Sequence, residues 1–435
     1  MSAQSQLRAP QVFVETSHTL PLVSMSMYMR SGTAHEPESH RGIMRIAARM
    51  LRRGTPTMNA QQIDERLDEL GAELTVDVST EVTGLHLTVL RRNLDAATML
   101  LSELLHHASF PENEVAKLVR ETIAEIGDSR DSDRHLAHRS LRRALFGAHP
   151  YGRRSAGRVS TLQSFTAKDV QAYANAQLVN DDMLFGFSGD ITHANADEIA
   201  ARLSNTRPAK AAPASVLSDA IMAKGRHLIF VDKPDRSQTQ VMIGRLGTAP
   251  HDADHTALSV ANTIFGGTFT SRLMREVRSK RGWSYGAGSS LPVDKCRHEF
   301  TMSTSPAAKD AAACLALELQ LLEQLVADGV KDSELKFTKG YLKRSYAFER
   351  DTAAKRLGQL TDEALLSLPE HYHAGYLARV ASVTRESANT ALRSRIFPSD
   401  LFIVVVGTHA ELGAEIRSAC GELQSETIVP YMDVE

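Results

Sequence analysis

The sequence predicts an α+β protein made of two homologous halves, each a mostly antiparallel sheet with helices packed on one face. Three observations support this fold class. The chain has 435 residues, more than one typical core can hold. Alternating apolar segments typical of strands are interspersed with long segments of helical periodicity. Finally, similar strand patterns recur in the same order in the first and second parts of the chain, which indicates a duplication.

Two pairs of strands carry the repeat. The segments PLVSMSMYMRSGT (21–33) and SQTQVMIGRLGT (237–248) alternate apolar residues, end in Gly-Thr and precede a polar loop and a helix. The segments MLFGFSGD (183–190) and LFIVVVGT (401–408) have the pattern of a buried strand followed by glycine and a small polar residue. Both pairs are separated by nearly the same distance along the chain, so we expect the two halves to share one strand order.

A linker is expected between the halves at TRPAKAAPAS (206–215), which is rich in proline and alanine and has no periodicity. We therefore divide the chain into an N-terminal half, residues 1–210, and a C-terminal half, residues 211–435. Within the halves, the clearest helical periodicity lies at 97–109, 112–127 and 313–329.

Composition excludes several classes of function. The formal net charge is −2, so a nucleic acid or an anionic membrane has no global electrostatic attraction for the chain. The 3 cysteines lie far apart and are expected to be small buried hydrophobic residues. The longest apolar run, 401–406, is too short to span a bilayer. Residues 1–20 lack the pattern of a signal peptide, which predicts a cytoplasmic protein, or a periplasmic one if such a peptide has been removed.

The segment GIMRIAARMLRRGT (42–55) predicts an amphipathic helix that stops near Gly54. Arg45 and Arg49 lie four positions apart on one face, where like charges cost about 0.2–0.5 kcal/mol. A solvated face is the simplest explanation. The spacing is also that of the H-x-x-E-H zinc helix, in which two imidazoles bind the metal and the glutamate activates a bound water. Here Arg45, Ala48 and Arg49 occupy those positions, and neither a guanidinium nor alanine can take those roles.

Three blocks in order resemble the insulinase/pitrilysin family of zinc peptidases, to which mitochondrial processing peptidase belongs: residues 30–55, 141–157 and 266–289. The first is similar to the zinc-helix block, the second to the block with Leu-Phe and His-Pro, and the third to a block of the family's second half. The resemblance is strongest to the bacterial two-subunit branch. In the third block, Arg278 and Tyr285 match the arginine and tyrosine that complete the family's active site.

The resemblance implies a lost zinc site. Glu125 matches the family's third zinc ligand, but without the histidines we expect it to be a stranded glutamate on a helix surface. No cofactor is therefore expected in this chain, and zinc is expected in a partner subunit. Arg278 and Tyr285 would be the catalytic residues, the phenol stabilising an oxyanion and the arginine positioning the substrate carbonyl. The alternative reading of this block is a solvated basic helix followed by a strand with a core tyrosine.

Three functions remain as hypotheses. The first is the non-zinc subunit of a heterodimeric zinc endopeptidase, paired with a homologous subunit that has intact H-x-x-E-H and acting on an unfolded peptide added to a sheet edge. The second is a catalytically inert structural or peptide-binding member of the family. The third, an independent enzyme, lacks any group of residues to support it.

Other candidate sites are weaker. Three histidine pairs could suggest metal ligands, but no carboxylate or cysteine cluster accompanies them in the sequence; they are His106 with His107, His135 with His138, and His371 with His373. His149 is expected to be a structural turn residue. Gly266 and Gly267 lack the lysine of a phosphate loop and are expected to allow close approach at a helix end.

Overall fold

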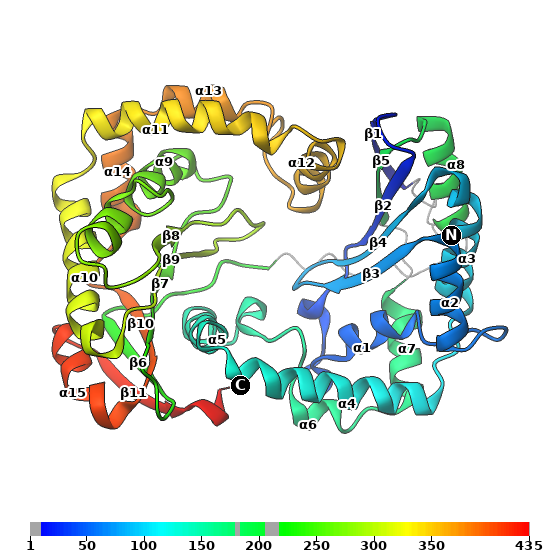
Figure 1. Cartoon of the computed structure of the whole chain (residues 1–435), viewed down its shortest axis with the longest axis horizontal. Helices are drawn as coiled ribbons and strands as arrows, with labels where there is room; N and C mark the ends of the chain where they lie inside the picture. The colour runs from blue at the N-terminus through cyan, green and yellow to red at the C-terminus, as the bar shows by residue number, and fades with distance from the viewer. Residues whose placement is uncertain (1–9, 179–182, 205–216, 435) are drawn as a thin grey trace, which may run out of the picture. The chain divides into compact units, whose positions relative to one another are not determined.

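The computed structural model describes residues 10–178, 183–204 and 217–434, arranged in two compact units (Figure 1). Unit 1 draws on residues 1–126, 153–216 and 348–365 of the chain, and unit 2 on residues 127–152, 217–347 and 366–435. Each unit therefore follows one half of the sequence apart from one segment taken from the other half. The expected linker at 206–215 lies outside the described residues, as does the division between residues 210 and 211.

Unit 1 contains a five-stranded sheet with the order β1-β5-β2-β4-β3. Only β1 and β5 are parallel, and the other neighbours are antiparallel. The strands are β1 (Gln11–Thr16), β2 (Leu22–Met29), β3 (Glu73–Val78), β4 (Thr83–Leu90) and β5 (Met183–Gly189).

Unit 2 contains a six-stranded sheet with the order β11-β6-β10-β7-β9-β8. Its strands are β6 (Arg226–Asp232), β7 (Gln240–Leu246), β8 (Ala287–Ser290), β9 (Glu299–Thr304), β10 (Leu401–Gly407) and β11 (Ser425–Pro430). When β6 to β10 are matched with β1 to β5 in chain order, the two sheets have the same strand order and the same parallel pair. The predicted duplication and the α+β fold class are confirmed, and β11 is an addition at the edge.

The α-helices lie between these strands along the chain. Those up to the middle of the chain are α1 (Ile43–Met50), α2 (Ala60–Leu70), α3 (Leu94–His107), α4 (Glu112–Asp128), α5 (Asp133–Phe146), α6 (Val159–Leu162), α7 (Ala167–Gln177) and α8 (His193–Ser204). The later ones are α9 (His255–Phe265), α10 (Ala311–Asp328), α11 (Asp332–Ser345), α12 (Ala353–Leu365), α13 (Tyr376–Ser382), α14 (Arg385–Arg395) and α15 (His409–Ala419). The three predicted helical runs correspond to α3, α4 and α10. None of the helices in the described ranges has the length and apolarity to cross a bilayer.

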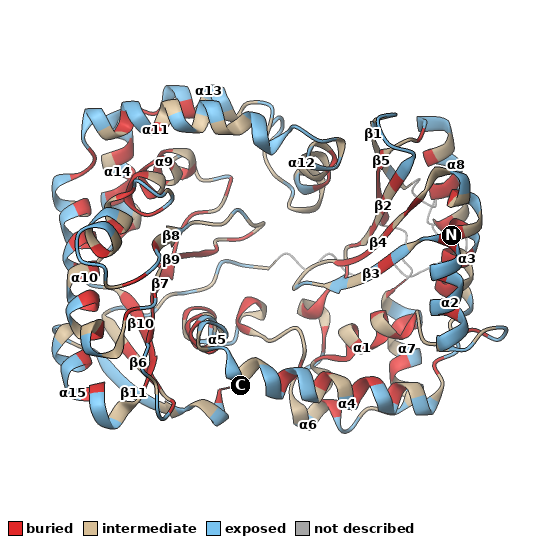
Figure 2. Cartoon of the chain, in the orientation of Figure 1, coloured by how far each residue is buried: buried red, intermediate tan, exposed pale blue. Residues whose placement is uncertain are grey.

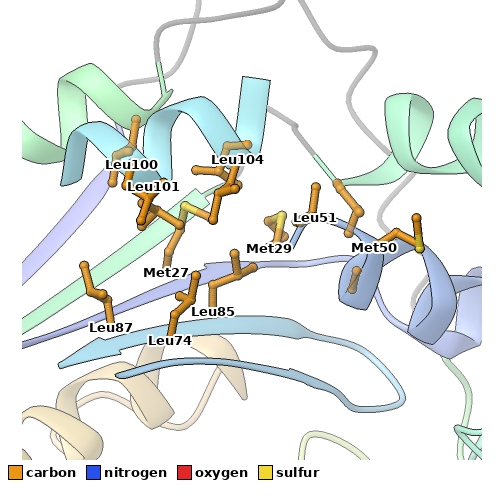
Figure 3. Close-up of a cluster of buried hydrophobic side chains, with 14 of the residues drawn as sticks. Met27, Met29, Met50, Leu51, Leu74, Leu85, Leu87, Leu100, Leu101 and Leu104 are labelled. Atoms are coloured by element: carbon orange, nitrogen blue, oxygen red, sulfur yellow. The ribbon is translucent and has the colours of Figure 1, made fainter. Parts of the chain in front are cut away.

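The core of unit 1 lies between its sheet and the helices on one face (Figures 2 and 3). Alternate residues of β2, among them Met27 and Met29, point into this core because side chains of a strand alternate between its two faces. They pack with Leu85 from β4, Leu101 from α3 and Met50 from α1. The apolar stripe of α1 is therefore a core stripe, and its arginines occupy the other side of the helix.

The sheet of unit 2 is covered on both faces. Ile403 and Val405 of β10 pack into a cluster with α9, α10 and α15, whereas Phe402 and Val404 pack into a second cluster with α5. Burial on both faces explains why the segment 401–406 is apolar without alternation.

The two units exchange equivalent helices. Helix α5, from the N-terminal half, packs on β7 and β10 of unit 2, and α12, from the C-terminal half, packs on β5 and β1 of unit 1. A glycine permits each approach: a Cβ on Gly244 would lie 2.8 Å from Leu141 of α5, and one on Gly186 would lie 3.2 Å from Leu357 of α12. Helical periodicity places residues on a helix but does not tell which sheet the helix covers, so the sequence did not predict this exchange.

Candidate functional site

The matched zinc-helix positions lie in unit 1 and form an ion-pair cluster. Arg45 and Arg49 extend from successive turns of α1 toward α4. Arg45 Nη2 lies 2.8 Å from Glu125 Oε2, and Arg49 Nη1 lies 3.0 Å from Glu125 Oε1. Glu125 was expected to be stranded, and this is corrected: each carboxylate oxygen accepts a hydrogen bond from one arginine. The carboxylate also removes the like-charge conflict that the sequence raised.

The start of α1 is fixed by a buried carboxylate. Gly42 adopts a left-handed conformation with φ of 96°, and Glu36 accepts hydrogen bonds from the backbone N–H groups of Gly42 and Met44 at 2.9 and 2.8 Å. Glu36 therefore satisfies two of the N–H groups that a helix N-terminus leaves free. Burial raises the pKa of Glu36 to about 7 in spite of these hydrogen bonds.

This cluster does not offer a metal site. The guanidinium groups have no free lone pair, and Ala48 is fully buried in the core. Across the described residues, no group of three or more histidine, cysteine, aspartate or glutamate side chains is placed to hold a metal ion. The helix that matches the zinc helix of the peptidases is thus a structural element here, and ion pairs from Arg45 and Arg49 to Glu125 join it to α4.

Arg278 and Tyr285 lie in unit 2, on either side of a tight reversal of the chain. Arg278 belongs to a π-helical segment, η6 (Met274–Ser279), and its guanidinium carbon lies 4.6 Å from the ring centroid of Phe269. This distance is that of a cation–π contact. Within the described residues, Arg278 forms no ion pair, so its charge is not consumed by a carboxylate of the unit. Gly282, with φ of 66°, then turns the chain toward β8.

Tyr285 projects outward from a fixed backbone. Ser284 Oγ donates to the carbonyl of Gly286 at 2.7 Å and accepts from the backbone N–H of Ser305 at 3.1 Å, which ties the turn to β9. Tyr285 itself is 89% exposed. The alternative reading of a core tyrosine is therefore wrong, and packing gives no reason for an aromatic residue at this position.

Tyr285 lines a pocket of about 960 Å³ that lies wholly within unit 2. Its floor is formed by β7, β8 and β9, with short side chains such as Ser289 and Ser303, and one wall is α5. Phe269 and Tyr341 contribute further aromatic rings, and these residues are 65% and 41% exposed respectively. This volume is at the upper end of the range for ligand sites, roughly 300–1,000 Å³.

A polar network that the sequence did not predict lies in the same pocket. Glu299, almost fully buried on β9, is 2.6 Å from His298 Nδ1, 3.4 Å from His138 Nε2 and 3.5 Å from Arg142 Nη1. Burial alone would raise the pKa of Glu299, but hydrogen bonds from His138 and His298 and the charge of Arg142 hold it well below its usual range. The sequence indicated no carboxylate partner for His138, since Glu299 is remote in sequence and reaches α5 only because that helix covers this sheet. This single carboxylate does not make a metal-binding cluster among the described residues.

The structure also shows where the other histidines, the cysteines and Gly266 lie. His106 contacts the carbonyl of Leu203 at 3.3 Å, and His149 lies in the turn after α5, where its ring contacts the carbonyl of Ser218 at 2.9 Å. Among the described residues, His371 forms an ion-pair contact with its exposed neighbour Glu370 alone. The three cysteines are free and buried, as expected. A Cβ on Gly266, at the end of α9, would lie 2.3 Å from Ser289 N, so the predicted close approach is confirmed.

Fold and residues together define a class: a duplicated α+β protein whose first half has the helix of a zinc peptidase without its ligands. Comparison with known protein families supports this class. Residues 11–158 match the family described as insulinase (peptidase family M16), and residues 164–342 match the peptidase M16 inactive domain. The chain belongs to the M16, or insulinase, family, and within it the replaced zinc ligands make it an inactive type of member.

Relatives in several bacteria are distant but span most of the chain. An uncharacterized zinc protease of Rickettsia felis is 25% identical over 76% of this chain and 79% of its own length. The uncharacterized zinc protease YmxG of Bacillus subtilis is 22% identical, with coverage of 91% and 95%. A Helicobacter pylori protein named non-peptidase homolog YmxG is 22% identical, with 92% of each chain covered. Both zinc proteases and a non-peptidase are therefore among its relatives.

Solved structures share the fold. A peptidase M16 inactive domain from Pseudomonas fluorescens superposes with a TM-score of 0.83 at 24% identity, covering 92% of this chain and 96% of that one. A protease from Helicobacter pylori superposes with a TM-score of 0.82 at 16% identity, covering 92% and 97%.

Proposed function

We propose that this chain is the non-zinc-binding subunit of a heterodimeric zinc endopeptidase and that it contributes Arg278 and Tyr285 in trans to the zinc site of a homologous partner. The partner would carry an intact H-x-x-E-H helix, and the substrate would be an unfolded peptide. The observation that carries this proposal is the 89% exposure of Tyr285 beside a large pocket.

Folding stability gives little reason for a tyrosine at position 285. An exposed tyrosine on a fixed turn contributes little to the free energy of folding, since it buries almost no apolar surface. The Ser284–Gly286 hydrogen bond fixes the backbone around Tyr285, and the phenol O–H at the end of its exposed side chain can donate to an oxyanion that develops during peptide hydrolysis. Arg278, stacked on Phe269 rather than paired with a carboxylate, retains its charge and N–H donors for a substrate carbonyl.

The test is reconstitution with the zinc-bearing homologue. In the assembled pair, Tyr285→Phe should lower turnover of an unstructured peptide by about 10²–10³, the usual loss for one oxyanion donor. Because the phenyl ring is kept, heterodimer formation and the zinc content of the partner should not change. Arg278→Ala should also lower turnover, and the double variant should lose less than the product of the two single losses if the residues act as a unit.

The structural or peptide-binding hypothesis makes the opposite prediction. Full turnover with Tyr285→Phe, in a pair shown by size to be assembled, would remove this chain from the chemistry. Failure of this chain to associate with any H-x-x-E-H homologue would remove the partnership itself.

A further inference from the structure

We propose that the unit 2 pocket is a subsite for an acidic side chain in an extended peptide, flanked in that peptide by an aromatic or large apolar residue. The inference rests on the proposed function only in that both place an extended peptide along this pocket. It concerns binding by this chain alone, whereas the proposed function concerns turnover by a pair.

The charged residues that line the pocket favour an acidic ligand. Its described lining contains two arginines and two histidines but a single carboxylate, Glu299. That carboxylate is already matched, since it contacts His298, His138 and Arg142. Arg142 is held further by hydrogen bonds from its Nε and Nη2 to the carbonyl of Tyr151. The balance in the pocket is therefore an excess of positive charge, in contrast to the chain as a whole, which carries −2.

Arg134 is the cation available to a ligand. It lies in the first turn of α5 with an exposed side chain and, among the described residues, makes no hydrogen bond or ion pair. His138 follows one turn later on the same face of the helix. A concave site with an excess of one sign of charge attracts the opposite charge in a ligand, so Arg134, with His138 beside it, should favour a carboxylate.

The chemistry of the other walls favours a peptide. Phe269, Tyr285 and Tyr341 offer exposed rings, and exposed aromatic residues are enriched where proteins bind partners. The strands below them carry glycine and serine, including Gly288, Ser289 and Ser303, whose short side chains let an extended backbone approach. Single-stranded nucleic acid also uses cations and stacking rings, but the negative net charge of the chain opposes a polyphosphate.

The experiment measures binding of short fluorescein-labelled peptides to the single chain, without partner or zinc, by fluorescence anisotropy. Three peptides differ only at the residue before a central phenylalanine, which is Asp, Asn or Lys, and a single-stranded oligonucleotide forms a fourth arm. The Asp peptide should bind tightest, and its advantage over the Asn peptide should shrink with added salt. Arg134→Gln should weaken the Asp peptide about threefold to tenfold and leave the Asn peptide unchanged.

The matched control is Arg393→Gln, which removes another exposed arginine without a partner in the described residues, on α14 and outside the pocket. It should not change any affinity. The inference is overturned if the Asp and Asn peptides bind equally, if the Lys peptide or the oligonucleotide binds as tightly, if no peptide binds, or if Arg134→Gln and Arg393→Gln act alike. If Tyr285→Phe lowers the turnover of the reconstituted heterodimer while the Asp and Asn peptides bind the single chain equally, the proposed function stands and only this subsite is refuted.

Discussion

Arg49 Nη1 lies 3.0 Å from Glu125 Oε1, and the second oxygen of the same carboxylate lies 2.8 Å from Arg45 Nη2. The sequence resemblance implies that the matching positions of the family's zinc peptidases hold zinc ligands. Here two positive side chains and one negative side chain take the place of a cation and its ligands. Ion pairs thus join α1 and α4. We expect this contact to weaken when either the arginines or the glutamate are replaced by neutral residues.

The first prediction concerns this ion-pair cluster. Glu125→Gln leaves two arginines one turn apart without a counter-charge, and since the groups are partly exposed, the loss in free energy of unfolding should be about 1 kcal/mol. Glu121→Gln on the same helix is the control, because in the described part of the chain Glu121 pairs with one arginine, Arg53, and the loss should be smaller. Urea unfolding at low and high salt measures both. Equal losses, or a Glu125 effect that grows with salt, would contradict the assignment.

The second prediction concerns zinc. The purified chain should contain no stoichiometric zinc and cleave no peptide, because guanidinium groups cannot ligate the metal. Metal analysis after dialysis checks this, and one tightly held zinc per chain would refute it. The variant Arg45→His with Arg49→His restores two imidazoles opposite Glu125 and should take up zinc that is lost again with Glu125→Ala. Ala48 is left unchanged, because its full burial would make an unpaired carboxylate there destabilising.

The third prediction concerns a buried acid of unit 2. Glu318 of α10 is fully buried, accepts a hydrogen bond from Thr304 at 3.0 Å, and burial raises its pKa to about 8. The folded state therefore holds a proton that the unfolded state releases near pH 4.5, so the stability associated with this group falls as pH rises from about 4.5 to 8. Glu318→Gln keeps an acceptor for Thr304 and cannot ionise. Its stability relative to the wild type should rise across this range and level off above it.

Thermal unfolding of both proteins from pH 4 to pH 9 tests the Glu318 prediction, and the difference between them isolates this residue from Glu36, whose pKa is also raised, to about 7. A difference that does not depend on pH would show that Glu318 is ionised in the folded protein.

The fourth prediction concerns the exchanged helix α5. A Cβ on Gly244 would lie 2.8 Å from Leu141, so Gly244→Val should force α5 from the sheet and cost about 1–3 kcal/mol, the usual range for overpacking. Leu141→Ala, which alone leaves a cavity, should partly restore the stability of Gly244→Val by making room. Chemical denaturation of the four proteins of this cycle gives the coupling energy. Additive losses would show that Gly244 does not set the approach of α5.

The sequence alone determined the duplicated fold, because each signal involved is local. Alternation in 21–33 and 237–248 and continuous apolar runs in 183–190 and 401–408 reflect burial of one or both faces of a strand, and these became β2, β7, β5 and β10. The identity of the side chains also decided the loss of zinc ligands, since no fold can give arginine a lone pair. These conclusions require no knowledge of which distant segments meet.

Only the tertiary structure decided which groups meet across long stretches of chain. It paired Glu125 with both arginines, brought Glu299 to His138, and exposed Tyr285 beside a pocket rather than burying it. Each depends on packing between segments far apart in the sequence, and the Glu299–His138 contact depends on the placement of α5 in unit 2. The physical reason is that helical and strand periodicities specify which face of an element is apolar, whereas the choice of the surface that covers it arises from packing between residues far apart in sequence.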